Sequence, residues 1–197
     1  MYIKICKCKE CATTSNVLLD RVIAVLDKNE SSEEWFVKSL KDDYIVRVKT
    51  ISYIVDAKPK VEYDIDELQK IASLMSVDKI HFIDETGTIY SGSIPKYFGY
   101  SFDPGAHMAF FKQILNNYEL TLCQDVTPNM AQAKEMMYAI TWNESKTHRV
   151  QVGIRPKRLL KALKQNQISN VVANIPVYKG MEIYVVNSKT KIIEGGY

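Results

Sequence analysis

The stretch that decides the fold is Val77-Asp78-Lys79-Ile80-His81-Phe82-Ile83-Asp84-Glu85-Thr86-Gly87-Thr88-Ile89-Tyr90. Its two ends are rich in β-forming residues, and Ile80 and Phe82 alternate with polar residues, as in a strand with one buried face. Between the ends, Asp-Glu-Thr-Gly is a turn sequence, with Gly87 at a position that suits a tight reversal of the chain. The stretch therefore predicts a β-hairpin.

On the N-terminal side of the hairpin, apolar residues recur every three or four positions, which indicates amphipathic helices. The pattern is interrupted near Asn29, and two serines followed by two glutamates then suit a fresh helix cap. Three helices are therefore expected. The first begins at Ser15 or Asn16, and the second begins at Ser31 or Ser32 and ends before Pro59. The third runs from Asp64 to Ser76.

After the hairpin, residues 93–105 combine glycine, proline, serine and aromatic residues, which indicates an ordered loop. The elements expected beyond it are a helix over 106–118, strands over 120–126, 136–143 and 149–154, a helix over 156–174, and a second hairpin within 181–193. This order predicts an α+β fold, in which a long N-terminal helix packs on an antiparallel sheet.

Composition and motifs exclude several classes of function. The chain has 197 residues, of which 46% are hydrophobic, and a net charge of +3, which is too small to indicate a nucleic-acid partner. No apolar run approaches the roughly 18 to 20 residues that span a bilayer. His81, His107 and His148 lie outside any metalloprotease motif, and the sequence has no glycine-rich phosphate loop. An enzyme is therefore not expected.

The cysteines are unevenly placed. Cys6, Cys8 and Cys11 form a C-x-C-x-x-C cluster without the second pair of ligands that a zinc site normally has. A zinc site and a tip without a folding role are both compatible with this spacing, and neither a metal nor a cofactor is predicted. Cys123 lies in an apolar run and is expected to be a small buried residue.

Polar and aromatic side chains on the predicted strands suggest a binding site. Arg149, Gln151 and Gly153 share one face of their strand by the alternation of side chains. The predicted lining of a small-molecule pocket is Tyr100, Asp103, Gln124, Asp125, Tyr138, Trp142, Arg149 and Gln151. Arg149 can hold a carboxylate through two hydrogen bonds. The alternative is that Arg149 pairs with Asp125, that the rings belong to the core, and that no pocket exists.

The order of elements, together with four short segments, resembles the extracellular double-Cache (PAS-like) sensor domains of bacterial membrane receptors. The segments are Asp64-Ile65-Asp66-Glu67-Leu68, Val77-Asp78-Lys79-Ile80-His81, Asp84-Glu85-Thr86-Gly87 and Gln151-Val152-Gly153-Ile154-Arg155-Pro156. The resemblance covers residues 16–197. It implies an N-terminal helical region (1–58), a membrane-distal PAS-like module (59–155), a connecting helix (156–175) and the beginning of a truncated membrane-proximal module (176–197).

The resemblance implies an extracellular domain of a bacterial signal-transduction receptor that binds a small molecule. The long helix of such domains passes the signal to an output that is commonly a histidine kinase, a diguanylate cyclase, a phosphatase or a chemoreceptor. The membrane would be reached through flanking segments that this chain lacks. The family's arginine-tryptophan-tyrosine pattern for amino acids is absent, so an amino-acid ligand is not expected.

The N-terminal helix suggests an interaction between two copies of the chain. Leu18, Val22, Val25 and Asn29 lie at spacings that suit a partner helix, which predicts a homodimer through this helix. A structural or protein-interaction module without a small-molecule ligand is the alternative function.

Overall fold

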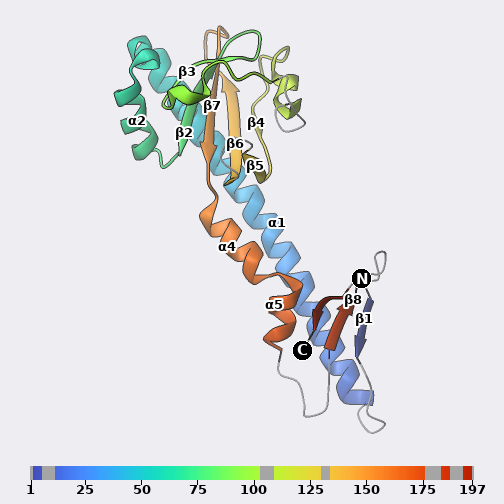
Figure 1. The fold of residues 1–197 in the computed structure, drawn as a ribbon. Coiled ribbons are helices and arrows are strands. Elements are labelled where there is room, and N and C mark those ends of the chain that lie inside the picture. Colours follow the sequence, from blue (N-terminus) through green and yellow to red (C-terminus); the bar gives the residue numbers. More distant parts are fainter. Residues whose placement is uncertain are drawn as a thin grey trace. The chain divides into compact units, whose positions relative to one another are not determined.

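The structure is a computed structural model that describes residues 2–5, 12–102, 109–129, 134–175, 183–186 and 193–196 (Figure 1). Its contacts divide the chain into two units. One unit combines Met1–Phe36 with Lys157–Tyr197, and the other is Val37–Pro156. Among the described residues, no helix has both the length and the apolar character needed to cross a bilayer.

The unit Val37–Pro156 is built on an antiparallel sheet with the strand order β3-β2-β7-β6-β4, in which β5 also pairs with β6. The strands are β2 (Lys79–Ile83), β3 (Ile89–Gly92), β4 (Leu122–Cys123), β5 (Thr127–Asn129), β6 (Lys134–Trp142) and β7 (Arg149–Ile154). The predicted α+β fold, with a long N-terminal helix and an antiparallel sheet, is confirmed.

The predicted hairpin is formed by β2 and β3, and its turn is held by the Asp84 carboxylate. This group accepts hydrogen bonds from the Thr86 amide (2.9 Å), the Thr86 hydroxyl (2.6 Å) and the Thr88 amide (3.0 Å). Gly87 has a φ of 87°, a left-handed conformation that glycine adopts without strain. The Asp-Glu-Thr-Gly sequence thus specifies this turn.

The part of helix α1 (Ala12–Ala57) that belongs to this unit runs along one side of the sheet (Figure 1). Two polar contacts join α1 to the loops of this sheet. Lys41 forms an ion pair with Asp125, which follows β4 (2.6 Å), and Asp56 accepts a hydrogen bond from Asn143, which follows β6 (3.0 Å). The residues that α1 buries in this unit are Tyr44, Val48, Ile51 and Val55. Their spacing of three or four residues matches the predicted apolar stripe.

The predicted helix break near Asn29 is wrong, because α1 is continuous over 46 residues. The Ser31 hydroxyl donates to the carbonyl of Asp27 (3.0 Å), and the Ser32 hydroxyl donates to that of Lys28 (2.7 Å). Serine can bond back to the preceding turn in this way inside a helix, and it then does not act as a cap.

Shorter helices complete the unit Val37–Pro156. The Asp64 carboxylate accepts a hydrogen bond from the Glu67 amide (3.0 Å), which confirms Asp64 as the predicted cap of α2. Within the described residues, the shorter helices with defined bounds are η1 (Pro59–Tyr63), α2 (Ile65–Leu74), η2 (Pro95–Tyr97) and η3 (Phe110–Ile114). In the described part of the predicted helix 106–118, Ala109 is α-helical and Phe110–Ile114 form the 3₁₀ helix η3.

The other unit joins the two ends of the chain in one antiparallel sheet. β8 (Ile183–Val186) pairs with β9 (Ile193–Gly196), as the predicted second hairpin, and also with β1 (Tyr2–Ile5). The sequence analysis missed β1. The predicted helix 156–174 is two helices, α4 (Lys157–Gln165) and α5 (Ile168–Ala173), because Gln167 between them has an extended ψ of 137°.

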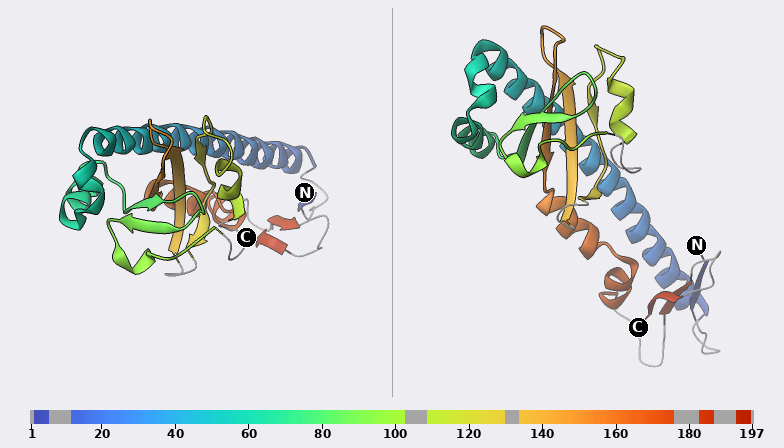
Figure 2. Two further views of the ribbon diagram at one scale, coloured as in Figure 1. Left: turned by 90° about the horizontal axis from the view of Figure 1, so that it is seen from above. Right: turned by 45° about the horizontal axis from the view of Figure 1, so that its top comes forward.

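The core of this unit lies between α1, α5 and β8. Figure 2 shows α4 and α5 beside the N-terminal half of α1. The core residues are Leu18, Val22, Val171, Val172, Ile175 and Val185, and Val25 is partly buried against them. Leu18 and Val22 therefore pack within the chain, which corrects the prediction that they face a partner helix.

Candidate functional site

The register of β2, β7 and β6 places three rows of side chains on one face of the sheet. The rows are Lys79, Gly153 and Tyr138; then His81, Gln151 and Ile140; then Ile83, Arg149 and Trp142. Tyr97, Phe102, Phe111 and Ile114, from the segments between β3 and β4, pack in one apolar cluster with members of these rows. We call this face, with its three rows, the covered face.

Lys79 is a buried cation on the covered face. Its side chain is 3% exposed, and its Nζ donates hydrogen bonds to the hydroxyls of Tyr97 (2.8 Å) and Tyr138 (3.4 Å). Burial, together with the nearby charge of Lys96, lowers the pKa of Lys79 to about 8. Among the ion pairs between described residues, none involves Lys79. The charge of Lys79 is therefore held by neutral groups.

His81 and Gln151 form a buried pair in the next row. His81 Nδ1 lies 3.1 Å from Gln151 Oε1, and the two residues are 3% and 2% exposed. Burial lowers the pKa of His81 to about 4, so its imidazole is neutral at pH 7. The Nε2 atom of each residue is buried without a hydrogen-bond partner. The pair therefore retains unused hydrogen-bonding capacity on the covered face.

Arg149, in the third row, holds two loops. One guanidinium NH₂ group donates to the carbonyl of Asp84, and the other donates to that of Leu115 (3.2 Å). The guanidinium carbon also lies 3.9 Å from the ring centroid of Trp142. Trp142 Nε1 in turn donates to the carbonyl of Ile114 (3.0 Å). Both NH₂ groups of Arg149 are therefore engaged with the backbone.

The structure brings together four of the eight predicted site residues, namely Tyr138, Trp142, Arg149 and Gln151, on the covered face. Asp125 lies elsewhere: its carboxylate is 72% exposed and pairs with Lys41 of α1, so the alternative pairing of Arg149 with Asp125 is not formed.

The other three predicted site residues lie at the edge of the covered face or outside the description. Gln124 is buried; its backbone N–H donates to the Tyr138 carbonyl (2.8 Å), and its side-chain Oε1 accepts a hydrogen bond from the Thr127 hydroxyl (3.3 Å). Tyr100 is 50% exposed and packs edge-on against Tyr97. Asp103 lies outside the described residues.

Sequence reasoning missed Lys79, His81 and Tyr97 as site residues. The alternation within Lys79–Ile83 puts Lys79 and His81 on one side of β2, which was visible in the sequence. Their importance depends on the pairing of β2 with β7, which sets His81 opposite Gln151. The sequence does not contain that register.

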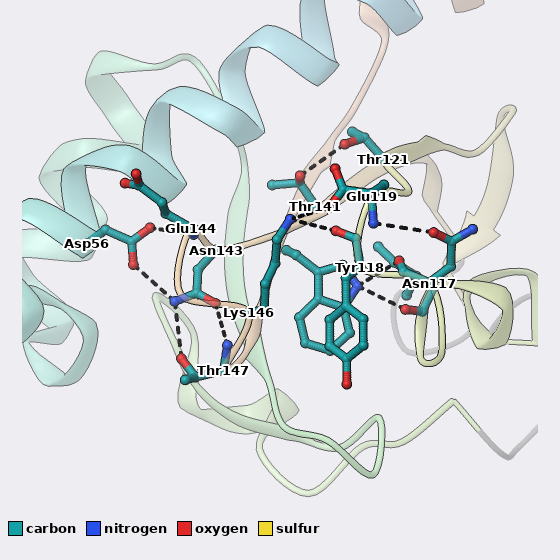
Figure 3. Close-up of polar contacts among 12 residues, drawn as sticks. Asp56, Asn117, Tyr118, Glu119, Thr121, Thr141, Asn143, Glu144, Lys146 and Thr147 are labelled. Carbon is teal, nitrogen blue, oxygen red and sulfur yellow. Dashed lines mark hydrogen bonds and ion pairs between the residues drawn. The ribbon is translucent and has the colours of Figure 1, made fainter.

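A pocket of about 470 Å³ lies at the turn between β6 and β7, near the end of α1. It is lined by Val55, Asp56, Pro59, Glu62, Asn143, Glu144, Ser145, Thr147 and His148. Figure 3 shows Asn143 between Asp56 and Thr147: its Nδ2 donates to Asp56, and its Oδ1 accepts from the Thr147 amide (2.9 Å). The carboxylate of Asp56 also accepts from the Glu144 amide (2.9 Å). These polar groups stabilise the turn, so we do not assign a ligand to this pocket.

In the described ranges, no group of three histidine, cysteine, aspartate or glutamate residues is arranged to hold a metal ion. Cys6, Cys8 and Cys11 lie outside those ranges. Cys123 is a partly buried free thiol, and burial raises its pKa to about 12, so the thiol stays protonated at pH 7.

The sequence matches no protein-family model, and no curated protein matches it. Among solved structures, the chain is similar to the Bacillus subtilis YkuI protein, which has an EAL domain and was crystallised with c-di-GMP and calcium. That similarity has a TM-score of 0.51 and 13% identity, and it covers 68% of this chain. The chain spans 36% of the length of that protein, and at this identity the similarity concerns the fold alone.

Two sensory domains are also similar to the chain. The ligand-binding domain of the Campylobacter jejuni chemoreceptor Tlp3, in complex with 4-methylisoleucine, has a TM-score of 0.47 at 11% identity and covers 92% of this chain and 70% of its own. The sensor domain of the Vibrio cholerae histidine kinase DctB has a TM-score of 0.47 at 12% identity, with coverages of 93% and 68%. Sensory domains of bacterial receptors are thus among the solved structures to which the chain is similar.

Proposed function

We propose that the chain is the ligand-sensing part of a bacterial signal-transduction receptor and lies on the extracellular side of the membrane. Residues 59–155 are the sensing module, and a small molecule binds on the covered face. The domain itself is not catalytic, and segments flanking it reach the membrane. The observation that carries this proposal is a group of buried polar side chains: His81 and Gln151 each have one buried nitrogen without a hydrogen-bond partner, and Lys79 is a buried cation whose hydrogen bonds go to neutral hydroxyls.

The energetics of burial support a binding role for this group. A buried charge or amide without full compensation costs free energy, and apolar residues of similar size commonly fill such positions at no cost or with a gain in stability. A ligand that completes the pairing of three such residues on adjacent strands explains their presence better than a purely structural role does. The cluster of Tyr97, Phe102 and Phe111 provides apolar walls beside them.

The signal is proposed to leave the sensing module through α1. This helix buries Tyr44, Val48 and Ile51 within the module and continues without a break into the other unit. A change in the sheet on ligand binding therefore acts on a helix that extends beyond the module. Known outputs of such receptors include histidine kinases and diguanylate cyclases, and we propose an output of this kind.

A screen of small metabolites by thermal shift, followed by isothermal titration calorimetry, tests the proposal. A ligand at 100 times its Kd stabilises the folded state by about 2.7 kcal/mol. Binding is expected to disappear in Lys79→Met and to persist in Lys38→Met, a matched change at an exposed lysine of α1. If no compound of a broad library binds the folded protein, the proposal is wrong.

A second candidate function is homodimerisation through the N-terminal helix. The side chains of Val17 and Trp35 are 63% and 71% exposed. Because an α-helix has about 3.6 residues per turn, the two residues are separated by five turns of α1 and lie on the same side of the helix. A large exposed tryptophan on a helix whose other side is buried favours a partner chain. Sedimentation of the intact chain should give the mass of a dimer, and Trp35→Glu should give a monomer, whereas Lys38→Glu should not. A monomeric intact chain would exclude this candidate.

A further inference from the structure

We propose that one side of helix α4 is a docking surface for a bilayer that contains anionic phospholipids. This inference rests on the proposed function, because the membrane of the receptor supplies that bilayer. It adds a direct contact between the folded chain and the membrane. The observations that carry it are the charge, the spacing and the exposure of the basic residues of α4.

Helix α4 concentrates positive charge. Its nine residues include four basic ones and no acidic one, and residues 145–181 contain no aspartate or glutamate. The net charge of the whole chain is +3 and that of α4 is +4, so the remainder of the chain carries −1. An anionic surface is therefore attracted to α4 rather than to the chain as a whole.

The four cations lie on one side of α4. Lys157, Lys161 and Lys164 follow one another at intervals of four and three residues, which places them in one row along the helix, and Arg158 lies beside that row. The row is roughly 10 Å long, at about 1.5 Å per residue. All four side chains are exposed. We call these four residues the basic row.

The opposite side of α4 packs within the chain. The side chain of Leu159 is 0% exposed. Seven residues further on, and thus on the same side, Asn166 donates a hydrogen bond from Nδ2 to Oε1 of Glu33 in α1 (2.8 Å). The basic row is therefore held in place on a packed helix and points away from the side that is buried.

The charges of the basic row are not used inside the chain. Among the ion pairs between described residues, none involves a residue of α4. A small anion is normally held in a concave site where several donors converge. Exposed cations in a row on the outer side of a helix instead suit an extended anionic surface, which contacts all of them at once.

The position of α4 in the chain favours a lipid surface over a nucleic acid. The unit that contains α4 also contains both ends of the chain. In the proposed function, the segments that reach the membrane flank those ends. A nucleic-acid partner is in addition disfavoured because the rest of the chain carries no excess of positive charge.

Co-sedimentation of the full chain with vesicles tests the inference. One set of vesicles contains equal parts of phosphatidylglycerol and phosphatidylcholine, and the other contains phosphatidylcholine alone. Each basic residue near an anionic bilayer strengthens binding roughly fivefold, so four should give a partition coefficient on the order of 10³ M⁻¹. At millimolar lipid, a large share of the protein should sediment with the anionic vesicles and none with the neutral ones. Raising the salt from about 0.1 M to about 0.5 M should release it.

Two variants of equal net charge separate the basic row from charge in general. The triple variant Lys157→Gln, Lys161→Gln and Lys164→Gln should bind about 100-fold more weakly, at roughly fivefold per lysine, and so escape detection. The control changes three exposed lysines elsewhere and should bind like the unaltered chain; its substitutions are Lys38→Gln, Lys49→Gln and Lys60→Gln. Circular dichroism checks that each variant is folded. Arginine at positions 157, 161 and 164 keeps the charge and should preserve binding.

The outcomes distinguish this inference from the proposed function. The inference is wrong if the chain does not bind anionic vesicles, binds neutral vesicles equally well, or loses binding equally in both triple variants. Tighter binding of a short DNA duplex than of vesicles, through the same lysines, would replace the lipid by a nucleic acid. If a metabolite binds the chain but vesicles do not, the sensing function stands without this contact. Vesicle binding without any metabolite binding leaves the membrane contact and removes the sensing function.

Discussion

Gly153 and Tyr138 lie directly opposite each other on β7 and β6, and the ring of Tyr138 occupies the space that a side chain at position 153 would need. A Cβ at Gly153 would lie 2.7 Å from Cε1 of Tyr138. Gly153→Ala should therefore displace the ring and its contact with Lys79. We expect a loss of about 1–3 kcal/mol in the free energy of unfolding, measured with urea, and weaker ligand binding.

A double-mutant cycle tests the cause of this loss. Tyr138→Leu removes the ring, so Gly153→Ala should cost much less stability in that background than in the unaltered chain. An equal cost in both backgrounds would show that the glycine is required by the backbone and that the ring is irrelevant.

The burial of Lys79 predicts an unusual dependence of stability on pH. The unfolded chain holds the lysine proton up to about pH 10.5, whereas the folded chain releases it at about pH 8. Stability should therefore rise with pH between these values, since the unfolded state binds more protons there. Lys79→Met removes the cost of burying this charge, so the variant should be more stable than the unaltered chain below pH 8. The difference in unfolding free energy should shrink by up to about 3 kcal/mol towards pH 10.5, since one pKa unit corresponds to about 1.4 kcal/mol.

The measurement is the difference in unfolding free energy between the two proteins at several pH values, because groups away from Lys79 titrate equally in both proteins and cancel. Lys38→Met, at an exposed position, should show a constant difference from the unaltered chain. A constant difference for Lys79→Met would contradict the buried, uncompensated charge.

Local patterns were sufficient to predict several elements. Asp64 and Gly87 act through neighbours within four residues, so the α2 cap and the hairpin turn could be identified from the sequence. Ser31 and Ser32 misled the analysis because the same hydroxyl can cap a helix or bond back inside one, and tertiary context decides between them.

Contacts distant in the sequence were not predictable in the same way. The pairing of β1 with β8 joins the two ends of the chain, and no local pattern encodes it. The residues of the candidate site were hard to predict for the same reason. Asp125 and Gln151 are both polar residues in or next to strands, but Asp125 pairs with Lys41 of α1, whereas Gln151 lies opposite His81. Only strand register separates these cases.

The buried imidazole of His81 should make the chain less stable in mild acid. The unfolded chain binds a proton near pH 6.5, whereas the folded chain binds it only near pH 4. As the pH falls from 6.5 to 4, the protonated unfolded state gains up to about 3 kcal/mol relative to the folded state. His81→Gln should lose correspondingly less stability between pH 7 and pH 4.5, as measured by urea unfolding. A variant that loses as much as the unaltered chain would show that carboxylates account for the whole effect.

Arg149 is expected to act as an anchor between loops, and the sequence analysis placed it in the ligand site. Its two NH₂ groups bond to the carbonyls of Asp84 and Leu115, and Arg149→Met leaves both without that partner. We expect a loss of about 2–4 kcal/mol in unfolding free energy. Arg149→Lys should restore little of it, because one ammonium group lacks the planar fork that reaches both carbonyls and stacks on Trp142. A lysine variant that regains full stability but loses the ligand would instead place the guanidinium in the binding site.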